Sequence, residues 1–245
     1  MKKIQFLLLN LLFIANLTVG SHDNAQKVSF DDTRSLHQIM NLSDRALNIL
    51  KKGNLKYLGS EVAKRDRKAL AQAQHPFATI LSCSDSRVAP EIIFNQGRVG
   101  SLFVTRNAGN VVDKMTLGTL EYGVEHLKTP LIIVLGHERC GAITAAVNAI
   151  LNHETPTNSH IQSIIDYINP SAKSIIEKMS PEDVANMSIK SKDDLITAIS
   201  QGNIHQVMQQ IIQDSPILAH AVIKKEVKII GAYYDLDEGN LIFIE

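Results

Sequence analysis

The sequence contains no tryptophan and only two cysteines among its 245 residues. Two cysteines cannot build a disulfide-rich scaffold, and they leave one disulfide, two free thiols or part of a metal site. Charge of one sign is not in excess, because 25 Lys and Arg residues balance 25 Asp and Glu residues. The sequence therefore does not have the excess of basic residues that is typical of a nucleic-acid-binding protein. A hydrophobic content of 44 % over this length is typical of a globular protein with a substantial core.

The first 20 residues have the layout of a secretory signal peptide. Lys2 and Lys3 precede a mostly apolar stretch over residues 4–17, and small residues follow at Gly20 and Ser21. A membrane anchor is the alternative, but the stretch is short for a span and is interrupted by side-chain amides. We therefore expect cleavage of residues 1–20 and a mature periplasmic protein that does not remain in the membrane.

Residues 21–245 are expected to form a single domain, since they contain no second long hydrophobic run, internal repeat or linker-like composition. Apolar residues at helical spacing predict an N-terminal helical arm over about 34–73. One helix of this arm should stop at Gly53, and a further helix should cover residues 61–73.

After the arm, short apolar runs alternate with helical patterns. Strands are predicted at 77–82, 101–105, 131–135, 227–234 and 241–244, with helices over 115–128, 141–152 and 159–224. Such alternation predicts an α/β fold whose mostly parallel sheet is flanked by helices. The last two strands share a turn at 237–240, which makes the final strand an antiparallel edge strand.

Both cysteines follow predicted strands, which is where ligands bind in a parallel sheet. If the first and third strands are neighbours, Cys83, His137 and Cys140 can meet at the same edge. Two thiolates and an imidazole suit zinc, and three protein ligands leave the open position of a catalytic site. The alternatives are a disulfide between the cysteines, or a thiol enzyme in which neighbouring arginines lower a cysteine pKa.

Asp85 and Arg87 lie just beyond Cys83. An adjacent guanidinium keeps a carboxylate ionised. Asp85 could therefore accept a hydrogen bond from a water molecule on the metal, or it could itself become the fourth ligand.

At these residues the chain resembles the β-class carbonic anhydrases. The motifs C-S-D-S-R-V at 83–88 and G-H-E-R-C-G at 136–141 are similar to the paired zinc signatures of that family. Further similar segments are L-K-K-G-N at 50–54, R-N-A-G-N at 106–110, T-L-E-Y-G-V at 119–124, S-P-I-L at 215–218 and I-I-G-A-Y-Y-D-L at 229–236. The resemblance extends from about Leu47 to the C-terminus.

The resemblance implies reversible hydration of carbon dioxide to bicarbonate and a proton, with one Zn²⁺ per chain. It implies that Cys83, His137 and Cys140 hold the zinc, that Asp85 orients the attacking hydroxide, and that Arg87 holds Asp85. It also implies contacts with substrate from a pocket, whose residues are Gln74, Phe103, Ala108 and Tyr122. Members of the family are usually homodimers or homotetramers, and part of the pocket comes from the partner subunit.

The sequence departs from some bacterial relatives at Ile80, where those members have a tryptophan that helps to bind inhibitory bicarbonate. We therefore expect that second site to be absent and the zinc site to be open at rest. Ala142 replaces a second glycine and does not affect the resemblance. An exported zinc protein with a closed, structural site remains the alternative outside enzymes.

Overall fold

The computed structural model describes residues 36–152 and 159–245. The expected signal peptide therefore lies outside the described residues. The chain divides into two compact units, one ending at Asn54 and the other beginning at Leu55, so the boundary falls within helix α1 (Leu36–Leu58). The second unit contains every strand that the structure describes.

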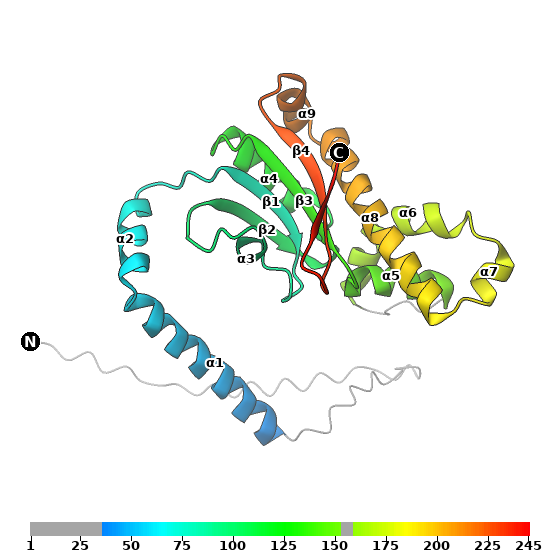
Figure 1. The fold of residues 1–245 in the computed structure, drawn as a ribbon, viewed down its shortest axis with the longest axis horizontal. Helices are drawn as coiled ribbons and strands as arrows, with labels where there is room; N and C mark the ends of the chain where they lie inside the picture. The colour runs from blue at the N-terminus through cyan, green and yellow to red at the C-terminus, as the bar shows by residue number, and fades with distance from the viewer. Residues whose placement is uncertain (1–35, 153–158) are drawn as a thin grey trace, which may run out of the picture. The chain divides into compact units, whose positions relative to one another are not determined.

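A five-stranded sheet forms the centre of the second unit, with the strand order β2-β1-β3-β4-β5 (Figure 1). Its strands are β1 (Ala78–Cys83), β2 (Leu102–Asn107), β3 (Leu131–His137), β4 (Lys228–Tyr234) and β5 (Leu241–Ile244). Strand β1 pairs in parallel with β2 and β3, and β3 pairs in parallel with β4. Only β5 is antiparallel, at the edge beside β4. The predicted fold class is therefore confirmed.

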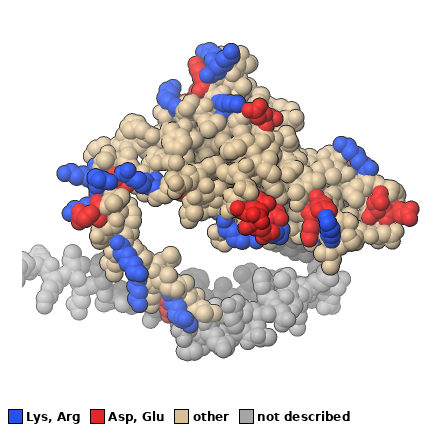
Figure 2. Space-filling model, in the orientation of Figure 1, with Lys and Arg blue, Asp and Glu red and all other residues tan. Residues whose placement is uncertain are grey.

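Helices connect and cover the strands. They are α2 (Glu61–Leu70), α3 (Pro90–Ile93), the 3₁₀ turn η1 (Ala108–Asn110), α4 (Lys114–Glu125), α5 (Gly141–Leu151), α6 (Ile161–Ile176), α7 (Pro181–Ala185), α8 (Ile189–Asp214) and α9 (Pro216–Ile223). No helix among the described residues is long and apolar enough to cross a membrane. On the face shown in Figure 2, acidic and basic side chains are interspersed.

Successive residues of the central strands face opposite sides of the sheet, and both sides are buried. Leu81 and Val134 pack in a cluster with residues of α4, α8 and α9. Their neighbours Ile80 and Leu135 pack in a second cluster on the other face. Burial on both faces explains why these strands appear in the sequence as continuous apolar runs rather than as alternating patterns.

The prediction that the second helix of the arm stops at Gly53 is wrong, because a single helix, α1, continues to Leu58. A Cβ atom on Gly53 would meet nothing within 4 Å outside the backbone of its own helix turn among the described residues, and the backbone of Gly53 stays helical. The helix ends at Gly59, and the side chain of Ser60 then caps α2 by accepting a hydrogen bond from the backbone of Ala63. A glycine weakens a helix by about 1 kcal/mol but does not end it unless a cap follows.

The other differences are in the element boundaries. Strands β1, β2 and β3 each end one or two residues later than predicted, so that Cys83 and His137 are the last residues of their strands. The predicted helical stretch over 159–224 is divided into four helices, and Ser180, Ser188 and Ser215 cap three of them.

Two glycines allow α8 to lie close to the sheet. A Cβ atom on Gly136 of β3 would stand 2.7 Å from Ile204 Cδ1, and one on Gly231 of β4 would stand 2.5 Å from Ile204 Cγ2. Ile204 is a residue of α8, and its side chain is fully buried against the two strands. The helix is therefore packed directly behind the end of β3 that carries His137.

Candidate metal centre

The parallel pairing of β1 with β3 brings Cys83 and His137 to one edge of the sheet. Ser82 is paired with Leu135, so the last residues of both strands lie at the same end. Cys140 follows three residues after His137 and occupies the N-cap position of α5. Adjacent strand ends and one helix start thus contribute the three side chains.

The ligand atoms of Cys83, His137 and Cys140 all lie within 4.8 Å of one another. The three residues are 4 %, 1 % and 1 % exposed. Their Sγ atoms are 4.0 Å apart and both cysteines are free thiols, whereas a disulfide requires about 2.05 Å. Two sulfurs bound tetrahedrally to zinc, each at about 2.3 Å, would stand about 3.8 Å apart. The spacing therefore fits a shared metal ion and contradicts the alternative of a disulfide.

The orientation of the His137 ring also fits a metal ligand. Its Nδ1 is 2.8 Å from the backbone carbonyl of Glu138, to which it donates. The lone pair of a neutral imidazole is then on Nε2, which is buried and has no hydrogen-bond partner among the described residues. A buried, unpartnered acceptor is costly unless something binds it. A carbonyl that holds the far nitrogen is the usual outer-shell arrangement of a metal-bound histidine.

The two thiols perturb each other's ionisation. The adjacent Cys140 thiol, followed by His137 and the backbone N–H groups of Gly109 and Asp85, lowers the pKa of Cys83 despite its burial. The neighbouring Cys83 sulfur, together with burial, raises the pKa of Cys140. One proton of the pair therefore leaves readily and the other is retained. A bound divalent cation supplies the charge that releases the second proton.

Asp85 lies beside this cluster but outside it. Its Oδ2 is 4.0 Å from His137 Nε2. Arg87 donates from Nε to Oδ1 at 2.9 Å and from a terminal nitrogen to Oδ2 at 2.7 Å, and its backbone N–H also donates to Oδ1. These bonds hold the pKa of the Asp85 carboxyl well below its usual range. The carboxylate is therefore ionised and engaged by the guanidinium.

Arg106, at the end of β2, holds the backbone between the cysteine and the carboxylate. Its Nε donates to the carbonyl of Cys83 at 2.9 Å, and a terminal nitrogen donates to the carbonyl of Asp85 at 2.6 Å. These bonds fix the course of the chain that places both side chains. Arg106 belongs to a motif noted in the sequence, but the spacing of that motif does not reveal this contact.

A second arginine holds the segment between the other two ligands. Arg139 has a left-handed backbone (φ 49°), a conformation that costs energy outside glycine. It donates to Asp237 in the turn between β4 and β5 at 2.6 and 2.8 Å, and to Glu138 at 3.0 Å. Glu138 in turn accepts from the backbone of Leu236. The hairpin turn therefore stabilises the strained backbone between His137 and Cys140.

The predicted pocket residues lie in different parts of the structure, and Ala108 is the one that lies next to a residue in contact with Cys83. Ala108 begins η1 and is followed by Gly109, whose N–H points to the Cys83 sulfur at 3.4 Å. Phe103 pairs with Thr79, about 13 Å along the strand from Cys83 at the usual rise per residue. Its ring lies 5.9 Å from that of Tyr122. Phe103 and Tyr122 thus form a patch that does not belong to the metal cluster of their own chain.

Gln74 is exposed in the segment between α2 and β1.

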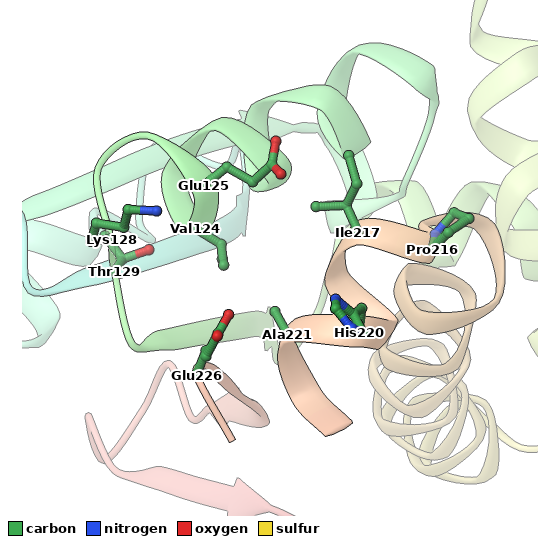
Figure 3. Close-up of a pocket in the computed structure, with 9 residues that line it drawn as sticks. All are labelled: Val124, Glu125, Lys128, Thr129, Pro216, Ile217, His220, Ala221 and Glu226. Carbon is green, nitrogen blue, oxygen red and sulfur yellow. The ribbon is translucent and has the colours of Figure 1, made fainter. Parts of the chain in front are cut away.

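A separate hollow of about 590 Å³ lies between the end of α4 and α9 (Figure 3). Its polar side chains include Glu125, Lys128, His220 and Glu226, which are all exposed. The hollow shares no residue with the Cys83 cluster, and its mixture of charges favours neither an anion nor a cation. His220 therefore has no assigned role.

The burial of both cysteines disfavours the alternative of a thiol enzyme. Reactive cysteines are partly exposed and lie in electropositive surroundings, whereas Cys83 and Cys140 are both buried. The Arg87 guanidinium is engaged by a carboxylate, and so is that of Arg139.

Comparison with known proteins identifies the relationship. The model of the family described as carbonic anhydrase matches residues 78–241. Carbonic anhydrase 2 of Mycobacterium tuberculosis is 33 % identical over 204 residues, which is 80 % of this chain and 90 % of that protein. A carbonic anhydrase of Mycolicibacterium smegmatis is 32 % identical over 201 residues, again 80 % of this chain and 90 % of the relative.

Solved structures agree with the sequence comparison. The β-carbonic anhydrase of Coccomyxa, in complex with acetazolamide, has a TM-score of 0.67 at 27 % identity and covers 80 % of this chain and 85 % of its own. The β-carbonic anhydrase CcaA has a TM-score of 0.66 at 25 % identity over 83 % of this chain and 95 % of its own. A β-carbonic anhydrase of Sordaria macrospora, described as tetrameric, shares the fold with a TM-score of 0.69 at 22 % identity, covering 81 % of this chain and 96 % of its own. The chain belongs to the carbonic anhydrase family and is a β-class carbonic anhydrase.

Proposed function

We propose that this protein uses one zinc ion per chain, held by Cys83, His137 and Cys140, to interconvert carbon dioxide and bicarbonate. The observation that carries the proposal is the buried cluster of two free thiols and an unpartnered imidazole nitrogen. Soft sulfur and borderline nitrogen donors suit zinc better than magnesium or calcium, which prefer oxygen. Zinc bound with one position open lowers the pKa of water to about 7 and thus supplies hydroxide near neutral pH.

Asp85 is proposed to orient the attacking oxygen. An ionised carboxylate can only accept hydrogen bonds, so Asp85 would accept a hydrogen bond from the O–H of the attacking hydroxide, which leaves a lone pair of that oxygen directed at the carbon of carbon dioxide. The hydroxide keeps its proton, the new C–O bond forms as one C=O π bond opens to give bicarbonate, and the other proton of the original water leaves to solvent. The 4.0 Å distance from Asp85 Oδ2 to His137 Nε2 places the carboxylate beside the cluster.

Arg87 is proposed to keep Asp85 in this role. Its two side-chain hydrogen bonds occupy both carboxylate oxygens. They oppose protonation of Asp85, and they also oppose its movement into the fourth ligand position. The arrangement supports an open site, the state expected from the sequence.

Carbon dioxide is small and apolar, so apolar contacts and a few polar groups are sufficient for its pocket. Ala108 lies next to the Gly109 N–H that reaches Cys83. Gln74, Phe103 and Tyr122 are proposed to contribute to such a pocket in an assembled protein. Phe103 and Tyr122 form a patch that lies apart from the Cys83, His137 and Cys140 cluster of the same chain. Such a position suits residues that complete the site of a partner subunit.

We infer that the protein is a homodimer or homotetramer. The patch of Phe103 and Tyr122 continues to Met115, which is 79 % exposed, and the three residues line one shallow hollow. A large exposed side chain next to an aromatic pair is typical of an interface. The tetrameric assembly of the Sordaria macrospora relative supports this inference.

We also propose export to the periplasm. The support is the sequence of residues 1–20, with two lysines, an apolar stretch and small residues at its end. Mass spectrometry of the protein recovered from the periplasm of expressing bacteria should give a chain that begins near residue 21. An uncleaved chain that stays with the cytoplasmic fraction would contradict export.

Replacement of the carboxylate should separate catalysis from metal binding. Asp85→Asn should keep one zinc per chain but lose about 100-fold or more in carbon dioxide hydration, the scale of a lost proton acceptor. Stopped-flow hydration assays and metal analysis on the same samples measure both. Removal of zinc by a chelator should abolish hydration in the wild type.

Glu91→Gln is the matched control, because it makes the same chemical change at an exposed position on the neighbouring helix α3. It should retain wild-type hydration. Full activity in Asp85→Asn would remove Asp85 from the mechanism.

Removal of the guanidinium should change how stability depends on pH. The folded-state pKa of Asp85 is depressed, so its stabilising effect is present above the unfolded value of about 3.9 and is lost as pH falls through the folded value. Arg87→Gln should therefore be less stable than wild type at neutral pH, with a difference that shrinks below about pH 4. Denaturant unfolding over a pH series measures this difference.

The control is the same replacement in an Asp85→Asn background, where the effect of Arg87→Gln should not vary over this pH range. A difference that is equally pH-dependent in both backgrounds would show that Arg87 does not act on Asp85.

Disruption of the patch should separate the subunits. Met115→Glu should lower the sedimenting mass and the hydration rate together, because a charge is buried in the interface. Ile189→Glu, which changes a residue 85 % exposed at the start of α8, should affect neither. An unchanged mass for Met115→Glu would place the interface elsewhere.

A further inference from the structure

Behind the Cys83 sulfur, two consecutive hydrogen bonds lead back to helix α8. The backbone N–H of Gly109 donates to Cys83 Sγ at 3.4 Å. The side-chain amide of Asn203 donates from Nδ2 to the carbonyl of Gly109 at 3.0 Å. Asn203, which is 94 positions from Gly109 in the sequence, is thus connected to the proposed metal ligand Cys83 through Gly109 alone.

Gly109 can transmit this contact because its conformation is unusual and closely confined. It has a left-handed φ of 78° inside η1. A Cβ atom there would stand 2.8 Å from Ile168 Cδ1 and 3.1 Å from Ala142 Cβ. Gly109 carries both the carbonyl that Asn203 holds and the N–H that points at the sulfur. Holding the carbonyl therefore restricts the direction of the N–H.

Asn203 is well placed to hold Gly109 rigidly. It is 1 % exposed and lies on α8, next to Ile204, which packs against Gly136 and Gly231 of the sheet. Burial of an amide is costly unless its hydrogen bonds are made. The Nδ2 atom of Asn203 makes its hydrogen bond to the Gly109 carbonyl, and Oδ1 has no hydrogen-bond partner among the described residues. A fold that needed only packing here would be served by an apolar side chain.

We propose that Asn203 is a positioning residue of the metal centre, which holds Gly109 so that its N–H donates to the Cys83 sulfur. This inference rests on the proposed zinc site. A hydrogen bond to a ligating sulfur withdraws part of the charge that the sulfur gives to the metal, and outer-shell contacts of this kind orient the ligand. Asn203 therefore affects how tightly the metal is held and how strongly sulfur donates to it.

The test uses Asn203→Leu in the full chain, with cobalt(II) as a spectroscopic replacement for zinc. Loss of the N–H···S bond raises the energy of the sulfur electrons, so the sulfur-to-cobalt charge-transfer band should move to longer wavelength. Because Cys83 is then no longer held in its ligating orientation, the affinity for the metal should fall about 10-fold, the lower end of the usual outer-shell effect, and a competing chelator should remove the metal correspondingly faster. Neither measurement depends on catalytic turnover.

Ser200→Ala is the matched control. Ser200 is buried on α8 one turn before Asn203, and its hydroxyl has no hydrogen-bond partner among the described residues. This variant should keep the wild-type band and release rate. Asn203→Ser is the second variant for the case in which leucine prevents folding, because a shorter side chain removes the contact with Gly109 with less disturbance of packing.

A shifted band and faster release in an Asn203 variant, with Ser200→Ala unchanged, would support the inference. A folded Asn203 variant with the wild-type band and release rate would overturn it. Equal changes in Ser200→Ala would also overturn it, because they would indicate general loosening of α8. A wild-type protein that binds neither zinc nor cobalt would instead overturn the proposed metal centre itself.

Discussion

The candidate metal centre depends on two buried sulfur atoms that lie 4.0 Å apart without a covalent bond between them. Each thiol alters the ionisation of the other, and His137, whose Nε2 atom has no hydrogen-bond partner in the part of the chain that the structure describes, offers a ligand nitrogen within 4.8 Å of both sulfur atoms. Such a group of atoms is unfavourable in an apolar interior unless a cation binds it. The position of the three side chains follows from the parallel pairing of β1 with β3, because that pairing fixes which strand ends are adjacent.

The surrounding groups divide into two sets with different tasks. Arg87 holds the Asp85 carboxylate in its ionised form beside the cluster. Arg106, Arg139 and Asn203 act on the backbone that carries the ligands, through carbonyls, a strained turn and η1. The bonds from Arg87 span only two residues, whereas those from Arg106, Arg139 and Asn203 join segments that are 23 to 98 residues apart in the sequence. The geometry of the site is therefore a property of the packed sheet and of α8 rather than of the ligand motifs alone.

Much of this fold was predictable from the sequence, for identifiable reasons. The central strands are apolar on both faces, and the polar motifs begin where each apolar run ends, so strand ends and ligand positions could be located together. The boundaries were less predictable: Gly53 lies within α1, because a glycine ends a helix only when a cap follows it. Arg106 was visible as part of a motif but not as a partner of two carbonyls. Asn203 gave no signal, because its contact with Gly109 depends on how α8 packs against η1. Phe103 and Tyr122 lie together but outside the cluster of Cys83, His137 and Cys140, and the sequence motifs that contain them do not indicate that separation.

The coordination of the metal is the most direct test of this account. X-ray absorption at the zinc edge of the purified protein should show two sulfur ligands at about 2.3 Å and two lighter ligands, nitrogen or oxygen, at about 2.0–2.2 Å. That result would place Cys83 and Cys140 on one ion, with His137 and one further group completing the set. A zinc spectrum without sulfur, or a metal-free protein whose two cysteines form a disulfide, would contradict the account.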